Sequence, residues 1–398
     1  MKYYQIKQTI AEGKFGLIRT ALRVNKLDRF SKDCSDFLEV VVKTIPKCSV
    51  EAKMIKRESK VLGHLDHPRV LRLIDTCEDD YSVHLITEYC KGQTLQQTIE
   101  AKKKLGQEEV VHILKILLQT VNYLHTQSIV HRDIKAENVI LLDQKDPKII
   151  DFGLSRFLGE KQVAKARVGS PFFMAPEVIS QKYTKSCDVW SVGVLAYYML
   201  SGKHPFTGES VEEVFGAITN YKLAKDWSDF SPQSKDLVSK LLEPNPQKRI
   251  TASKALKHSW FSGEPKLVSD WVLSSLLSSE KSQFVKQCME VAAKCIDYQR
   301  VKSLVEMFES IDCDKKGYIS CKDLKRLLST KKFSNKIYFS EFFTATFDLS
   351  TLNEEVLYFI FKHFDLDNDG LLSDKDLQDL HHNSTLNFEE FKSVLCNS

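Results

Sequence analysis

HRDIKAEN at residues 131–138 is followed by DFG at 151–153, and these two short motifs anchor the interpretation of the whole chain. The first of them brings Asp133, Lys135 and Asn138 together in one segment. Each residue alone has an ordinary explanation, because single polar side chains on loops are usually solvated, and His131 is more typical of a packed core than of a catalyst. The motifs on either side give the segment its meaning.

Further motifs follow and precede this segment in a fixed order. Downstream, APE lies at 175–177 and DVWSVGV begins at Asp188. Upstream, the run VVVK ends at Lys43 and predicts a β-strand, because β-branched residues favour strands. Glu58 lies in a segment with a helical pattern that follows this strand.

The first motif of the series is IAEGKFGLI, residues 10–18, in which Gly13 and Gly16 separate two alternating apolar runs. This pattern predicts a β-hairpin whose backbone can close over phosphates. Turn glycines are common, and Ala11 stands where the G-x-G-x-x-G pattern has its first glycine, so the motif is weak by itself. Its place at the head of the ordered series gives it weight.

Seven separated motifs in this order resemble a protein kinase, and the resemblance extends over residues 3–261. It implies a bilobal α+β fold that transfers the γ-phosphate of ATP to protein serine or threonine hydroxyls, with Mg²⁺ as the metal ion. Phosphoryl transfer develops charge on the migrating group, so catalysis is mainly positioning and electrostatic stabilisation. Glu177 and Arg249 match the family's buried ion pair, a structural role.

The resemblance also implies a role for each motif residue. Lys43 would hold the α and β phosphates and would itself be held by Glu58. Asp133 would take or orient the proton of the substrate hydroxyl, and Lys135, which marks serine/threonine kinases, would lie on the γ-phosphate. The implied residues are Ala11, Gly13, Gly16, Ile18, Lys43, Glu58, Glu88 and Asp151 for the nucleotide, Asp133, Lys135 and Asn138 for catalysis, and Asn138 and Asp151 for Mg²⁺.

Two positions depart from the family pattern. Ala166 stands three residues before Gly169, where many kinases carry a phosphorylated threonine or an acid that pairs with the arginine of HRD. Phosphorylation at this position is excluded because alanine has no hydroxyl, and Arg132 lacks its usual partner. Thr94 replaces a glutamate that often reads a basic substrate residue, although Glu137 persists, so a preference for an upstream arginine is weakened.

A different chemistry is predicted at DLDNDGLLSDKD, residues 365–376. The calcium ligands of an EF-hand loop map onto Asp365, Asp367, Asp369, the backbone carbonyl of Leu371, and Asp376, with Gly370 at the sharp turn. Ca²⁺ takes six to eight oxygen ligands, and apolar helical segments flank the loop, so a calcium site is favoured over an acidic surface turn. Asp376 is shorter than the usual glutamate, which is expected to weaken Ca²⁺ binding and to favour Mg²⁺ competition.

A second loop of this kind, DCDKKGYISCKD at residues 312–323, has lost part of its ligand set. Asp312, Asp314 and Asp323 remain, but Lys316 occupies a ligand position, and a cation there repels Ca²⁺. We expect this loop to be structural and loop 365–376 to be the principal site.

Two half-hands lack the acidic front half of a loop, and we expect each to pair with one of the two loops. They read IYFSEFF at 337–343 and LNFEEF at 386–391. The expected strand partners are Ile319 with Ile337 and Leu372 with Leu386. Between the pairs, Thr351 and Glu354 form a predicted capping box for a helix that runs to Phe364.

A junction, residues 262–300, connects the two parts of the chain. Within it, Phe284, Cys288, Val291 and Cys295 recur at helical spacing as an apolar stripe. The stripe is explained either by a packed connecting helix or by a regulatory helix that docks on the kinase in one state and on the calcium domain in another. We favour the regulatory role and expect an all-α EF-hand domain at residues 301–398, after the α+β kinase domain.

Composition limits the remaining possibilities. A net charge of +4 over 398 residues is too small to argue for nucleic-acid binding. No apolar run reaches the roughly 18 residues of a membrane span, and we see no membrane anchor. Ten scattered cysteines fit reduced thiols, so we expect a cytoplasmic protein, and a monomer.

A kinase domain, a junction helix and EF-hands in one chain resemble the calcium-dependent protein kinases of plants and protists. The resemblance implies ATP, Mg²⁺ and Ca²⁺ as cofactors, protein substrates, and inhibition by the junction that calcium relieves. Two alternatives remain open. One is a calcium-responsive pseudokinase scaffold, and the other is an active kinase whose EF-hands do not sense calcium.

Overall fold

The computed structural model describes most of the chain. The described residues are 4–13, 16–23, 39–48, 52–159, 162–224, 226–261, 282–296, 298–320, 322–324, 336–352, 354–365, 367, 369–373 and 385–396. Asp376 and the first part of the junction, residues 262–281, lie outside them.

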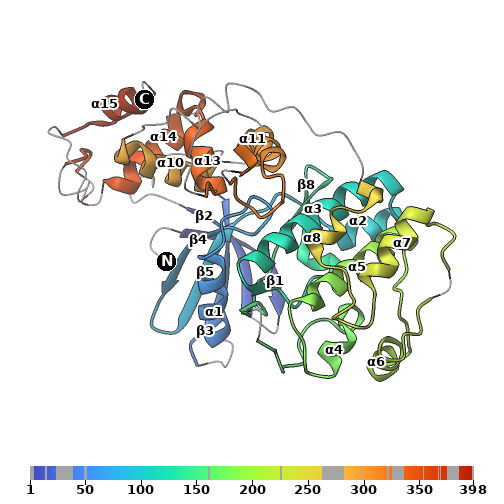
Figure 1. The fold of residues 1–398 in the computed structure, drawn as a ribbon. Coiled ribbons are helices and arrows are strands. Elements are labelled where there is room, and N and C mark those ends of the chain that lie inside the picture. Colours follow the sequence, from blue (N-terminus) through green and yellow to red (C-terminus); the bar gives the residue numbers. More distant parts are fainter. Residues whose placement is uncertain are drawn as a thin grey trace.

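A five-stranded antiparallel sheet with one long helix forms the small lobe (Figure 1). In chain order its elements are β1 (Tyr4–Gly13), β2 (Gly16–Arg23), β3 (Glu39–Pro46), helix α1 (Ala52–Leu62), β4 (Leu73–Glu78) and β5 (Ser82–Glu88), and the strand order is β1-β2-β3-β5-β4. Val40 and Val42 are fully buried on one face of β3. The alternation of a strand therefore turns Lys43 to the opposite face, toward α1.

The large lobe is mainly helical, and its core is built around two long helices. Helix α3 (Gln107–Thr126) and helix α5 (Ser186–Ser201) pack together, and nearly every residue of α5 is buried. The other helices are α2 (Leu95–Lys102), α4 (Pro176–Ile179), α6 (Val211–Thr219), α7 (Pro232–Leu241) and α8 (Ala252–Ala255), with 3-10 turns η2 (Ala136–Asn138), η3 (Pro171–Phe173) and η4 (Ser259–Phe261). Short strands β6 (Gly92–Thr94), β7 (Ile129–Val130), β8 (Val139–Leu142), β9 (Asp146–Ile149) and β10 (Arg156–Phe157) frame the segment 131–138.

The C-terminal part is an all-helical domain with its own apolar core (orange and red in Figure 1). Its helices are α10 (Gln283–Cys295), α11 (Tyr298–Ile311), α13 (Phe339–Thr346), α14 (Glu354–Phe364) and α15 (Phe388–Cys396), with a 3-10 turn η5 (Leu349–Thr351). The predicted strand pairings are both present, as isolated antiparallel bridges between Ile319 and Ile337 and between Leu372 and Leu386. Each loop is therefore paired with its half-hand, and the expected α+β kinase fold followed by an all-α domain is confirmed.

One local prediction was wrong. Helix α14 ends at Phe364 as expected, but it begins at Glu354, so Thr351 does not lie at the N-cap. Thr351 instead closes the preceding 3-10 turn, where its hydroxyl donates to the carbonyl of Asp348 at 2.6 Å. A local side-chain bond of this kind competes with helix capping for the same hydroxyl.

The junction helix α10 packs against α13 and α14 within the C-terminal domain. Phe284, Cys288 and Val291 of its apolar stripe are buried in that core, and Lys286 is exposed. The side chain of Cys295 lies outside the described residues. The expected domain limit at residue 301 falls inside helix α11.

Candidate active site and calcium loop

Three charged side chains meet between the two lobes. The Lys43 ammonium lies 2.8 Å from Glu58 Oε2 and 3.4 Å from Asp151 Oδ1, so β3, α1 and the DFG segment are joined at one point. Burial lowers the pKa of Lys43, but the Glu58 and Asp151 carboxylates outweigh it and leave the pKa raised. The lysine is therefore held as a cation by its two carboxylate partners.

The segment 131–138 forms a second cluster, close to the first. Asn138 Nδ2 donates to Asp133 Oδ2 at 2.9 Å, and the Lys135 ammonium lies 3.3 Å from the same carboxylate oxygen. His131 is fully buried, with its ring edge-on to Phe152 at 4.7 Å between centroids, so it is the packed core histidine that the sequence predicted.

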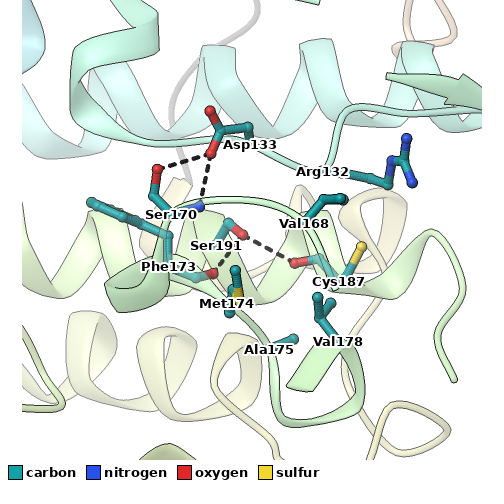
Figure 2. A pocket seen from close by; sticks show the side chains of 10 residues that line it. All are labelled: Arg132, Asp133, Val168, Ser170, Phe173, Met174, Ala175, Val178, Cys187 and Ser191. Atoms are coloured by element: carbon teal, nitrogen blue, oxygen red, sulfur yellow. Dashed lines mark hydrogen bonds between the residues drawn. The ribbon is translucent and has the colours of Figure 1, made fainter. Parts of the chain in front are cut away.

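Ser170 belongs to this cluster, although no motif identified it. Its backbone N–H and its hydroxyl both donate to Asp133 Oδ1 at 3.0 Å, and the Lys135 ammonium donates to its hydroxyl at 2.9 Å. Figure 2 shows Asp133 and Ser170 facing each other at the edge of a small cavity. The only sequence signal is its position directly after Gly169 and five residues before the APE motif.

The cavity in Figure 2 lies beneath the segment that links Ser170 to α4. Cys187 and Ser191 of α5 form its wall, and Ser191 donates to the carbonyl of Phe173 at 2.8 Å. Nearby, Arg249 makes a buried two-pronged ion pair with Glu177, with Nη2 2.9 Å from Oε2. This pair, which the sequence motifs implied, ties α4 to the segment before α8 and supports the floor of the site.

The predicted hairpin forms, with Gly13 opposite Gly16 and Ala11 opposite Ile18. Gly16 has a φ of 106°, and a side chain there would come within 2.3 Å of the Thr44 carbonyl oxygen, so only glycine is tolerated. Ala11 lies in extended backbone, where its methyl group causes no strain.

Glu88 ends β5 and differs from the other predicted nucleotide residues. Its carboxylate is 2.6 Å from the Lys148 ammonium and accepts from the Arg72 backbone N–H at 2.7 Å. The side chain is therefore bonded within the protein, which leaves only its backbone for a nucleotide.

At the two positions discussed for substrate preference, the Thr94 hydroxyl caps α2 in a capping box with Gln97, and Glu137 is exposed.

Loop 365–376 brings carboxylates together as predicted. Oxygens of Asp365, Asp367 and Asp369 lie within 4.8 Å of one another. Asp365 is buried, and its Oδ1 has no hydrogen-bond partner among the described residues, whereas Gly370 N donates to its Oδ2 at 3.2 Å. An unpartnered buried carboxylate oxygen facing two exposed carboxylates suits a hard cation such as Ca²⁺. Lys362 of α14 forms a buried ion pair with Asp365 Oδ2.

Loop 312–323 uses its carboxylates internally. Asp312 accepts from the backbone of Lys316 at 3.1 Å and of Gly317 at 2.7 Å, Lys316 pairs with Asp314, and Ser320 donates to Asp323. Burial raises the pKa of Asp312 to about 6. Oxygens of Asp312, Asp314 and Asp323 nevertheless lie within 4.8 Å of one another, so the structural role of this loop stays a prediction.

The same loop also contacts the large lobe. Asn122 of α3 donates to the Lys315 carbonyl at 2.7 Å, and a side chain at Gly317 would meet the Tyr123 ring at 2.1 Å. Close by, the buried Arg69 donates to Glu309 of α11 at 2.7 Å and to the Tyr298 hydroxyl at 2.7 Å. These contacts join the C-terminal domain to α3 and to the segment between α1 and β4.

Fold and site together define a protein kinase with an EF-hand domain attached. The protein kinase domain model matches residues 4–261, and the EF-hand domain pair model matches residues 348–381.

The chain belongs to the calcium-dependent protein kinase family. It is 33% identical to calcium-dependent protein kinase 17 of Arabidopsis thaliana over 406 residues, which cover 94% of this chain and 76% of the relative. Calcium-dependent protein kinase 7 of Oryza sativa subsp. japonica is 30% identical, with 95% and 74% covered. Calcium-dependent protein kinase 3 of Plasmodium berghei (strain Anka) is also 30% identical, with 96% and 73% covered. Among the described residues, no helix is long and apolar enough to cross a membrane.

Proposed function

We propose that this kinase transfers the γ-phosphate of ATP to serine and threonine residues of protein substrates under the control of Ca²⁺ at loop 365–376. The observation that carries the proposal is the intact set of Lys43, Glu58, Asp133 and Asp151 in one chain with an acidic loop whose buried Asp365 has an unpartnered oxygen. We further propose that the protein acts as a cytoplasmic monomer.

Each side chain has a definite task in this proposal. Lys43, held by Glu58, orients the nucleotide phosphates, and Asp133 accepts or orients the proton of the substrate hydroxyl. Lys135, which contacts both Asp133 and Ser170, neutralises charge near the transferred group. Asn138 uses its amide nitrogen on Asp133, so its amide oxygen and the Asp151 carboxylate are the donors that suit Mg²⁺, which supplies charge neutralisation at the phosphates.

Calcium control rests on the contrast between the two loops. Both loops bring oxygens of three carboxylates within 4.8 Å of one another, but in loop 312–323 Lys316 pairs with Asp314. Asp367 and Asp369 of loop 365–376 are exposed, and neither is in an ion pair among the described residues. We assign Ca²⁺ to Asp365, Asp367, Asp369, the carbonyl of Leu371 and Asp376. Residues 262–300 would then transmit the effect of bound Ca²⁺ to the kinase domain. Within them, α10 packs against α14, the helix that ends directly before loop 365–376.

The two alternatives make different predictions. A pseudokinase scaffold is disfavoured, because a protein that does not catalyse phosphate transfer would not need the Lys43–Glu58 ion pair or the Asp133 cluster. EF-hands without a sensing role would leave activity independent of calcium.

The test is transfer of a radiolabelled γ-phosphate from ATP to a generic protein substrate, with and without Ca²⁺, followed by identification of the modified amino acid. We expect label on serine and threonine, dependent on Mg²⁺ and increased by Ca²⁺, and none with Asp133→Asn. No transfer by the wild-type chain under any condition would favour the scaffold, and label on tyrosine would refute the assigned specificity.

A further inference from the structure

Arg132, next to the catalytic Asp133, makes contacts that differ from a simple ion pair. Its Nε donates to the Leu154 carbonyl at 2.7 Å, and its Nη1 donates to the Tyr183 hydroxyl at 3.2 Å. Among the described residues, no carboxylate lies within ion-pair distance of its guanidinium group, although such groups normally bind acids. Its backbone is fixed in the left-handed region, at a φ of 71°, by an N–H bond to Asp188 at 2.9 Å.

Tyr183 connects Arg132 to the segment that precedes the substrate site. It is 1% exposed, and its backbone pairs with Ala164 through hydrogen bonds of 2.8 and 3.1 Å. Its hydroxyl donates to the Ala166 carbonyl at 2.8 Å while accepting from Arg132. Burial raises the pKa of Tyr183, so the hydroxyl keeps the proton that it donates.

The segment anchored in this way leads directly to the catalytic carboxylate. Four residues beyond Ala166, Ser170 donates twice to Asp133 at 3.0 Å. Between them, Gly169 has a φ of 113°, and a side chain there would lie 2.6 Å from the Arg132 carbonyl oxygen. Movement of Ala166 would therefore be passed along a short, tightly packed path to Asp133.

We propose that Tyr183 is a positioning residue that holds the activation segment, residues 162–177, in place by bridging Arg132 and Ala166 through one hydroxyl. A neutral buried hydroxyl thereby does what an acidic or modified side chain at position 166 would do, and the segment needs no covalent modification there. This inference rests on the proposed function, because it concerns the rate of the same transfer reaction.

The first test is Tyr183→Phe, which removes the hydroxyl and keeps the ring. We expect kcat to fall about five- to tenfold, because the Arg132 guanidinium and the Ala166 carbonyl lose their shared partner, while KM for ATP changes less than about twofold, since Lys43 and Glu58 are untouched. Tyr197→Phe is the matched control: it also removes a buried-ring hydroxyl that donates to a backbone carbonyl, that of Asp226 at 2.9 Å, but on the far end of α5. Its kcat should equal that of wild type.

The second test is rescue. Ala166→Glu in the Tyr183→Phe background provides a carboxylate close to the Arg132 guanidinium. The two positions are near each other because, in the wild-type chain, the Tyr183 hydroxyl bonds to both Arg132 and the Ala166 carbonyl. We expect kcat to return to within about twofold of wild type. Unchanged kcat in Tyr183→Phe, or a loss that Ala166→Glu leaves in place, would overturn the inference. Absence of transfer by the wild-type chain would instead overturn the proposed function itself.

Discussion

Lys362 should limit the calcium affinity of loop 365–376. Its side chain is 4% exposed and is paired with the fully buried carboxylate of Asp365, the first ligand of the loop. Ca²⁺ binding must therefore break the ion pair between Lys362 and Asp365, and the bound Ca²⁺ is then repelled by the nearby ammonium group. At about 4 Å and an effective dielectric constant of about 20, a unit charge and a divalent ion repel each other by about 8 kcal/mol before relaxation. Movement of the lysine and solvent will remove most of this.

We therefore expect Lys362→Met, which keeps the apolar stem, to tighten Ca²⁺ binding tenfold to hundredfold, or about 1.4 to 2.8 kcal/mol. Calorimetric titration of the full chain with Ca²⁺ measures the change. Lys362→Arg keeps the charge and should bind like wild type. Lys392→Met, which removes a lysine from an exposed ion pair with Glu354 in the same domain, is the control for net charge. Equal or weaker binding in Lys362→Met would show that the lysine only stabilises the end of α14, and the reasoning would be wrong.

Three further predictions follow from the site and the domain contacts. Lys43→Met should reduce phosphate transfer about a hundredfold or more in a steady-state assay, with little change in thermal unfolding, because it removes a charge at the phosphates; near-normal turnover would contradict its role. A chain ending at residue 265 should transfer phosphate without Ca²⁺, because the junction is gone while the kinase core, which ends at Phe261, is complete; a folded but inactive product would rule out inhibition by the junction. Burial lowers the pKa of His67 to about 3, so below about pH 6.5 this histidine is protonated in the unfolded chain and neutral in the folded chain. The free energy of unfolding should therefore fall as the pH drops below about 6.5. Because His67 as a whole residue is half-buried, we expect a loss of only about 1 kcal/mol between pH 6.5 and 5 in denaturant unfolding, and a smaller loss in His67→Gln; a pH-independent midpoint would contradict this prediction.

The sequence predicted those features that depend on local motifs and spacing. The Lys43–Glu58 pair, the Asp133 segment and the bridges from Ile319 and Leu372 all form as expected, because ligand spacing and strand alternation are local properties. The start of α14 was missed, because the Thr351 hydroxyl bonds to the Asp348 carbonyl of the preceding 3-10 turn, a local alternative that the capping pattern does not reveal.

Contacts between distant surfaces could not be predicted. Arg69 and Glu309 are 240 residues apart in sequence, and neither residue carries a periodic signal that points to the other. The same is true of Tyr183 and Arg132, which meet only because the large lobe folds the intervening segment back. The first pair depends on how two domains dock and the second on how one lobe packs, and no short sequence pattern signals either contact.

The central claim is that calcium at loop 365–376 controls phosphate transfer. The most direct measurement is the initial rate of transfer to a protein substrate as a function of free Ca²⁺, for the wild-type chain and for Asp367→Ala/Asp369→Ala, whose altered residues are exposed and should not affect folding. We predict a rate that rises with Ca²⁺ in the wild-type chain and stays at its calcium-free level in the double variant. Equal wild-type rates with and without Ca²⁺, or a full calcium response in the double variant, would contradict the claim.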